Sequence, residues 1–131
     1  MLTIIITLLI LTKINAVYNG DLTFYGPGGA GANGACMLEV GFNGIGNTVA
    51  MNPHQYENGA ACGKCIMIYP STSGLGMTPV VEPIFATIDN LCPECKYGDV
   101  DIGLSGDGRW QSTWEFVSCH ESNRKHRYLR G

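Results

Sequence analysis

Short apolar and β-branched runs, separated by turn residues, make up most of the chain from residue 17 onward. Hydrophobic and polar side chains alternate within several of these runs, which is the period of a strand with one buried face. No 10-residue window in this region combines helical periodicity with capping residues, so the pattern does not predict a long helix. Six strands are predicted, within residues 21–26, 47–52, 65–70, 80–89, 99–104 and 109–119.

The clearest alternation lies in the last segment, RWQSTWEFVSC, where one face carries Trp110, Ser112, Trp114 and Phe116. Large aromatic side chains in a strand more often pack in a core than bind a ligand, so we expect both tryptophans to be buried. Short twisted strands must close on one another or pair their edges. The pattern therefore predicts a small, mainly β domain closed as a barrel.

The chain opens with an apolar run, LTIIITLLILT, over residues 2–12. A membrane-spanning helix needs about 20 apolar residues, whereas a shorter run followed by Ala16 is typical of a secretory signal cleaved after that residue. No basic residue precedes the run, and a buried or anchoring helix is the alternative. We expect a signal peptide over residues 1–16, one domain over 17–119 and a basic tail over 120–131. The protein is then secreted, with no membrane segment in its mature form.

Charge is unevenly distributed along the chain. Residues 17–118 carry ten acidic and three basic side chains, whereas residues 120–131 carry four basic and one acidic. An acidic domain is a poor footprint for nucleic acid, so we expect no nucleic-acid partner. The basic tail is predicted to be a solvated segment, with weak, salt-sensitive attachment to an acidic polymer as the alternative.

All six cysteines lie between residues 36 and 119. An even number of cysteines in a small secreted chain is typical of disulfides, and six cysteines allow 15 arrangements. Two Cys-x-x-Cys pairs, at 62–65 and 92–95, could instead bind zinc, but the 26 residues between them are many for a zinc ribbon. A redox pair would open a helix, whereas Pro93 and Gly98 favour a turn. We therefore expect three disulfides, no metal and no cofactor.

Four stretches, in order, resemble the expansin-like domain, which is itself similar to family-45 endoglucanases. They are the glycine-rich GDLTFYGPGGAGANGAC, the central VAMNPHQYENGAACGKCIMI, the segment NLCPECKYGDVDI and the closing GRWQSTWEFVSC. The resemblance implies a six-stranded double-psi β-barrel with the disulfides Cys36–Cys62, Cys65–Cys119 and Cys92–Cys95. Only twelve residues follow Cys119, so we expect a likeness to single-domain, loosenin-like or natriuretic-peptide-like members. We also expect a monomer.

The resemblance also implies a functional aspartate. Asp101 corresponds to the groove aspartate that the family requires for activity, which is the general acid in the related hydrolases. Its apolar neighbours Val100 and Ile102 could raise the pKa of Asp101. Strand alternation, however, points such neighbours to the opposite face, where they would shape the strand instead.

Four further residues are candidate substrate contacts. Thr23 and Tyr25 match groove positions of the opening strand in the family. Asn90 matches a groove position just before Leu-Cys-Pro; it is preferred to Asp89, because a slip of one residue changes the face of a strand. Tyr97, on the turn beside the second Cys-x-x-Cys, is an exposed candidate for a sugar contact.

Glycoside hydrolysis needs a second carboxylate, and Gly26 stands where the related hydrolases carry it. We therefore expect a non-enzymatic protein that binds cellulose-like cell-wall polysaccharide and loosens it without cutting it. A hydrolase or lytic enzyme using Asp101 as general acid with another base is one alternative, and a secreted signalling or defence module is the other. The segment GLSGDG replaces a short helix of typical family members, so one wall of the groove is expected to differ.

Overall fold

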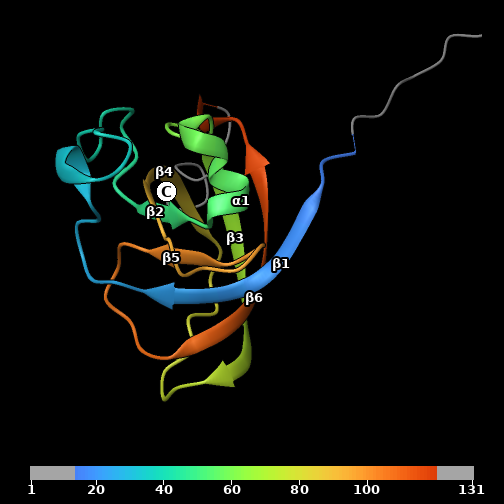
Figure 1. Ribbon diagram of the computed structural model, residues 1–131. Coiled ribbons are helices and arrows are strands. Elements are labelled where there is room, and N and C mark those ends of the chain that lie inside the picture. Colours follow the sequence, from blue (N-terminus) through green and yellow to red (C-terminus); the bar gives the residue numbers. More distant parts are fainter. Residues whose placement is uncertain (1–13, 121–131) are drawn as a thin grey trace, which may run out of the picture.

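Six strands form a closed ring in the computed structural model, which describes residues 14–120 (Figure 1). Their order around the ring is β1-β5-β2-β4-β3-β6. The strands are β1 (Val17–Phe24), β2 (Thr48–Met51), β3 (Cys65–Leu75), β4 (Ile84–Leu91), β5 (Val100–Ile102) and β6 (Arg109–Val117). The predicted signal peptide (1–16) and basic tail (120–131) lie almost entirely outside the described residues.

Each of the six predicted segments overlaps one strand, so the mainly β prediction is confirmed. The boundaries differ where pairing extends or ends a strand. β1 begins at Val17, ahead of the predicted start, because its first half pairs antiparallel with β6. β4 begins at Ile84 rather than at residue 80, directly after Pro83, which has no N–H to donate to a neighbouring strand.

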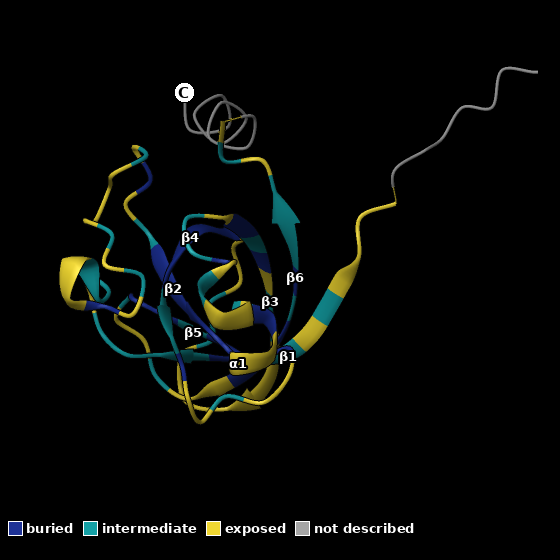
Figure 2. Ribbon diagram, turned by 45° about the horizontal axis from the view of Figure 1, so that its top comes forward, coloured by how far each residue is buried: buried dark blue, intermediate teal, exposed yellow. Residues whose placement is uncertain are grey.

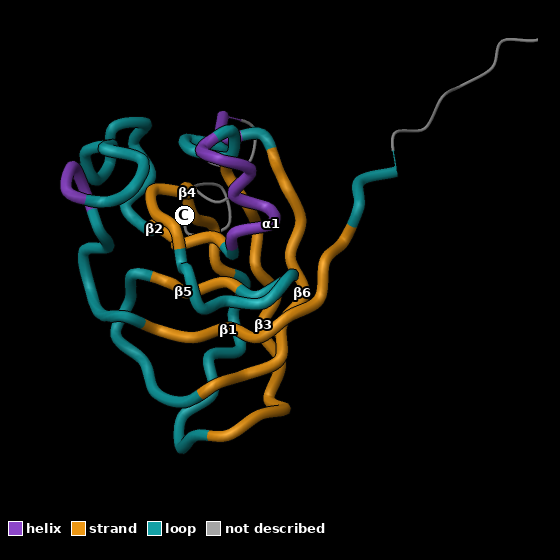
Figure 3. The backbone as a smooth tube through the Cα atoms, viewed as in Figure 1, coloured by secondary structure: helices purple, strands orange, loops and turns teal. Residues whose placement is uncertain are grey.

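Within residues 14–120 the chain also forms one short α-helix, α1 (Pro53–Tyr56), and two 3-10 turns, η1 (Gly31–Asn33) and η2 (Glu57–Gly59), which Figure 3 separates from the strands. Asn52 caps α1, its side-chain oxygen accepting a 3.1 Å hydrogen bond from the Gln55 N–H. Pro53 takes the first helical position, where a missing N–H costs nothing. The helix is too short for hydrophobic periodicity to reveal. No helix of the described residues is long and apolar enough to cross a membrane.

The interior of the ring is filled by apolar side chains from all six strands. Figure 2 shows these buried positions along the strands, with exposed positions mostly on the connections around them. Trp114 is fully buried and donates its indole N–H to the Gly98 carbonyl at 2.8 Å. Trp110 is also buried and donates to the Asp107 carbonyl at 2.7 Å. Both tryptophans are therefore core residues with satisfied N–H groups, as the alternation predicts.

Three disulfides join Cys36 to Cys62, Cys65 to Cys119 and Cys92 to Cys95, the pairs that the family resemblance implies. The Cys65–Cys119 bridge joins the start of β3 to the chain just after β6, across 54 residues of sequence. The Cys92–Cys95 bridge closes the turn between β4 and β5. Because every cysteine is in a disulfide, none can supply a thiolate to a metal.

Candidate functional site

Three of the predicted site residues lie in one row across four neighbouring strands, which we call the β1–β4 row. Thr23 of β1 is in register with Asp101 of β5, Asp101 with Ala50 of β2, and Ala50 with Asn90 of β4. Adjacent strands lie roughly 4.8 Å apart, so the row extends about 14 Å from Thr23 to Asn90. Asn90 is held at its end of the row, its side-chain oxygen accepting a 2.9 Å hydrogen bond from the Ala35 N–H.

Asp101 lies near the centre of this row and is partly exposed. Its neighbours Val100 and Ile102 are fully buried in the core, so strand alternation turns the carboxylate outward. Partial burial raises the pKa of Asp101, and the Thr23 hydroxyl, which donates a 2.9 Å hydrogen bond to Oδ1, opposes that rise. The side chains of Val100 and Ile102 therefore anchor β5 in the core. The pKa of Asp101 is raised chiefly because its own carboxylate is partly buried.

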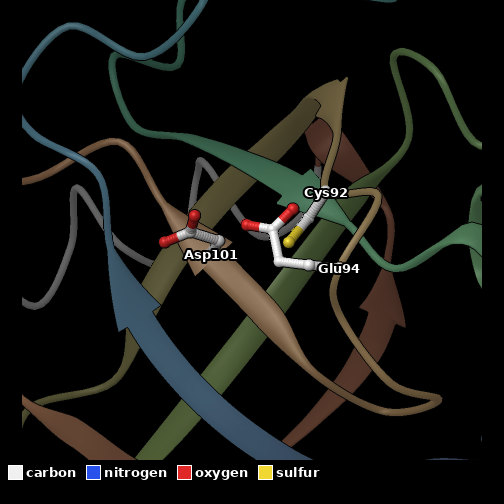
Figure 4. Close-up of side chains that lie close together, drawn as sticks. All are labelled: Cys92, Glu94 and Asp101. Atoms are coloured by element: carbon white, nitrogen blue, oxygen red, sulfur yellow. The ribbon is translucent and has the colours of Figure 1, made fainter.

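Glu94 is a second carboxylate beside Asp101 and is not among the site residues predicted from the sequence. Figure 4 shows it reaching from the turn toward Asp101. One oxygen of each carboxylate and the sulfur of Cys92 lie within 4.8 Å of one another. The negative charge of Glu94 contributes to the raised pKa of Asp101. The signal in the sequence is its place inside the Cys92–Cys95 loop, which the disulfide folds back toward β5.

The turn that leads into β5 is fastened to β1 by a buried carboxylate. Asp99 accepts two 2.9 Å hydrogen bonds, one from the Asp21 N–H of β1 and one from the Lys96 N–H of its own turn. Both carboxylate oxygens are therefore used within the fold. Asp99 is a positioning residue, since it fixes the strand two residues before Asp101.

A buried pair of amides holds the same turn from the side of α1. Asn52 donates to Gln55 Oε1 at 2.7 Å and to the Asp99 carbonyl at 3.2 Å. Gln55 Oε1 also accepts a 3.0 Å hydrogen bond from the Gly98 N–H. Asn52, which caps α1, therefore also holds the turn that leads into β5. Sequence reasoning missed this role, because it depends on contacts over more than 40 residues.

A bulge in β4 decides which of Asp89 and Asn90 enters the row. The register with β2 passes from Val49–Ile88 to Ala50–Asn90, so Asp89 is an extra residue on β4. Asp89 is 2% exposed, whereas Asn90 is partly exposed and in register with the row. Asn90 therefore lies in the row and Asp89 does not, and the role of Asn90 in binding stays a prediction.

Tyr25 directs its hydroxyl into a buried polar cluster rather than into solvent. The Tyr25 hydroxyl, the Thr48 hydroxyl and Asp89 Oδ1 are buried without a hydrogen bond of good geometry, while Asp89 Oδ2 accepts one from the Gly31 N–H at 3.2 Å. Burial, then the charge of Asp89, raises the pKa of Tyr25 to about 12. Burial also raises the pKa of Asp89, which its hydrogen bonds oppose. The Tyr25 hydroxyl is therefore buried near Thr48 and Asp89 and is not presented in the row.

Tyr97 is exposed, as predicted, but the structure does not bring it into the row. Its ring makes edge contacts with Tyr18 and His54, at centroid distances of 6.3 Å and 6.2 Å. Together with Lys64 and Phe116 it lines a separate hollow of about 160 Å³. Tyr97 is therefore grouped with the α1 side of the barrel and not with Asp101.

The segment GLSGDG, residues 103–108, is a non-helical loop. It crosses the side chain of Phe24, where a Cβ added to Gly106 would lie 2.5 Å from the aromatic ring. This close approach leaves no room for a side chain over Phe24. The backbone of the loop therefore packs directly against Phe24, at the end of β1.

No protein-family model and no curated protein matches this chain. Among solved structures, a point mutant of the Clavibacter michiganensis expansin in complex with cellohexaose matches with a TM-score of 0.60 and 21% identity, over 79% of this chain and 51% of that chain. The apo form of the Clavibacter michiganensis expansin matches with a TM-score of 0.59 and 22% identity, over the same shares of both chains. The chain thus spans about half the length of these expansins.

A Streptomyces papain inhibitor matches with a TM-score of 0.49 and 19% identity, over 79% of this chain and 96% of that chain, and we infer nothing from a score this low. Identities near 20% establish a shared fold and not a shared activity. The closed ring of six strands and the match to two expansin structures show that this protein has an expansin-like fold.

Proposed function

We propose that the protein is a secreted, expansin-like monomer that binds cellulose-like cell-wall polysaccharide and loosens it without hydrolysis. The observation that carries the proposal is the β1–β4 row, which aligns Thr23, Asp101 and Asn90 on a fold shared with an expansin crystallised with cellohexaose. The row offers a hydroxyl, a carboxylate and an amide, all of which bond readily to sugar hydroxyls.

Loosening of this kind needs no covalent step. Exchanging one hydrogen bond for another changes the free energy by only about 0.5–1.5 kcal/mol. A row of donors and acceptors can therefore compete with the hydrogen bonds between neighbouring polysaccharide chains. Asp101, held by Thr23 at 2.9 Å, is the strongest acceptor in the row when its carboxylate is ionised, because an ionised acceptor makes hydrogen bonds roughly twice as strong as a neutral one.

Glu94 favours one second candidate, a hydrolase in which Asp101 is the general acid. Retaining glycosidases hold their two carboxyl groups about 5–5.5 Å apart, and inverting enzymes about 6.5–9.5 Å apart. Here the nearest oxygens of Asp101 and Glu94 lie within 4.8 Å, a shorter separation than that of inverting enzymes. Glu94 is also exposed on a turn. The geometry thus favours binding over hydrolysis, with a retaining reaction as the competitor.

The test compares the wild-type protein, expressed from the full chain, with Asp101→Asn on cellulose paper and isolated cell walls. Mechanical extension and soluble-sugar release are measured on the same samples. Glu57→Gln, an exposed carboxylate of η2, is the matched control. We expect extension without sugar release, lost in Asp101→Asn and kept in the control. Sugar release that depends on Asp101 would establish the hydrolase instead, and no extension by the wild type would refute wall loosening.

A further inference from the structure

A cleft of about 640 Å³ lies on the outer face of the barrel, over β1, β6 and β3. These three strands are consecutive in the ring and run side by side (Figure 1). The side chains that define the cleft are Asn19 and Asp21 of β1, Gln111 and Thr113 of β6, and Tyr69 and Ser71 of β3. None of the residues discussed for the β1–β4 row lines it.

A bulge in β3 shapes one wall of this cleft. The β3–β6 register passes from Pro70–Ser112 to Gly74–Trp110, so residues 71–73 of β3 stand opposite the single residue Gln111 of β6. A bulge bends its strand and re-aims side chains, and such bulges are common beside functional sites. The position is fixed, because a Cβ at Gly74, whose φ is 156°, would lie 2.2 Å from a backbone carbonyl of β6.

The cleft presents unused hydrogen-bonding groups beside an exposed aromatic ring. Within residues 14–120, the side chains of Asn19, Gln111 and Thr113 have no hydrogen-bond partner. Tyr69 is 42% exposed at the same place. Amides and hydroxyls around one aromatic face match a sugar, whose ring packs on the aromatic while its hydroxyls bond to the polar groups.

The charge and composition of the cleft exclude several classes of ligand. The carboxylate that lines it, Asp21, is paired with Arg109 at 2.9 Å, and Glu115 lies beside Tyr69, where its negative charge disfavours an anionic ligand. It also lacks the basic side chains that would track a nucleic-acid backbone. Apart from Tyr69 and Pro70 it has no large apolar side chain, whereas the centre of a protein interface is apolar. A neutral polysaccharide fits best.

The cleft is continuous with the β1–β4 row along β1. Asp21 and Thr23 are two residues apart on one strand, so their side chains share the outer face at a spacing of about 7 Å. Thr23 binds Asp101 on its other side. One outer surface thus runs from the cleft, past Arg109, to Asp101 and Asn90.

We propose that the β1–β6–β3 cleft is a second glycan subsite, which binds further sugar units of the neutral chain held at Asp101. This inference rests on the proposed function above. A chain that occupies both places is held along several strands, so a long oligosaccharide gains affinity over a disaccharide through the second contact.

The experiment titrates the ¹⁵N-labelled protein with cellobiose and with cellohexaose and follows the backbone amide signals. We expect cellohexaose to shift the amides of Thr23 and Asp101 and also those of Ser71 and Gln111. Tyr69→Ala and Gln111→Ala change exposed side chains and should fold normally, which circular dichroism checks. Each should weaken cellohexaose binding about tenfold, or about 1.4 kcal/mol. Leu75→Ala, 79% exposed on the same strand but outside the cleft, should bind as the wild type does.

The outcomes separate this inference from the proposed function. If cellohexaose shifts only the amide signals of the row, and both cleft variants bind cellohexaose as the wild type does, there is no second subsite and the proposed function stands. If the cleft amides shift while Asp101→Asn binds normally, the cleft is a glycan site and the role proposed for Asp101 is wrong. If neither place responds to cellohexaose, xylohexaose or chitohexaose, both proposals fail.

Discussion

The Thr23 hydroxyl donates a 2.9 Å hydrogen bond to Oδ1 of Asp101, joining two residues 78 positions apart in the sequence. They meet because β1 and β5 pair in parallel, and parallel neighbours are always joined by a long connection. The bond favours the charged form of Asp101, while burial and the charge of Glu94 favour the neutral form. The protonation of the central carboxylate is therefore a balance that single substitutions can move in either direction.

Removing the Thr23 hydroxyl should raise the pKa of Asp101 further. Thr23→Val keeps the shape of the side chain but removes the donor that stabilises the carboxylate. The measurement is a ¹³C NMR titration of the Asp101 carboxyl. Thr23→Ser keeps the hydroxyl and is the control, with a pKa close to that of the wild type. An equal effect of both substitutions would mean that the hydrogen bond does not set the pKa.

Neutralising Glu94 should lower the pKa of Asp101. Glu94→Gln removes the like charge that disfavours ionisation and leaves burial and the Thr23 hydrogen bond in place. The same carboxyl titration detects the change, and Glu57→Gln should leave the Asp101 signal unmoved. If Glu94→Gln also abolished release of soluble sugar from glucan, the hydrolase hypothesis would gain its missing second carboxylate.

Replacing Asp89 by asparagine should stabilise the protein at neutral pH. Burial raises the pKa of Asp89 above its ordinary value of 3.8, so the folded state binds the proton more tightly than the unfolded state. Stability then falls as pH rises through the window between 3.8 and the raised value. The asparagine side chain cannot ionise, and its amide N–H can also donate to the Tyr25 or Thr48 hydroxyl.

We expect Asp89→Asn to gain about 1 kcal/mol in the free energy of unfolding at neutral pH, the size of one ordinary hydrogen bond. The gain should shrink as the pH falls below about 4, where the wild-type carboxyl becomes protonated in both states and can itself donate a hydrogen bond. Urea unfolding at a series of pH values measures it, with the exposed Glu39→Gln as control. A gain that does not depend on pH would point to packing rather than to ionisation.

Removing the Asn52 side chain should cost about 2–3 kcal/mol of stability, because it leaves buried partners unsatisfied and removes the cap of α1. The change in the midpoint of urea unfolding for Asn52→Ala measures this cost. His54→Ala alters an exposed residue of the same helix and should change stability by less than about 0.5 kcal/mol. Equal costs for the two variants would show that the amide network contributes little.

The alternating pattern and the family motifs were enough to predict the strands and most of the row. The face shared by Trp110, Ser112 and Trp114 predicts β6, because a half-buried strand must follow a period of two. The family motifs select Thr23, Asp101 and Asn90. These three residues lie in one row because each is part of a strand whose register is fixed by its buried side chains.

Features set by a single residue of register, or by a turn, could not be predicted in this way. The bulges at Asp89 and at residues 71–73 each add residues to one strand only, and no hydrophobic periodicity marks them. Glu94 reaches Asp101 because a disulfide folds its turn. Tyr97 was correctly predicted to be exposed, but the direction in which its turn faces depends on contacts with Tyr18 and His54.

Strand β5 is three residues long, and two of them, Val100 and Ile102, are fully buried. Val100 and Ile102 therefore tolerate little change, since any substitution there carries the cost of a disturbed core, and the proposed function needs Asp101 itself. New specificity for a different polymer would have to arise on other strands and loops, around an unchanged centre. A mutant library aimed at altered polymer preference would gain most from the positions that surround Asp101, and least from β5 itself.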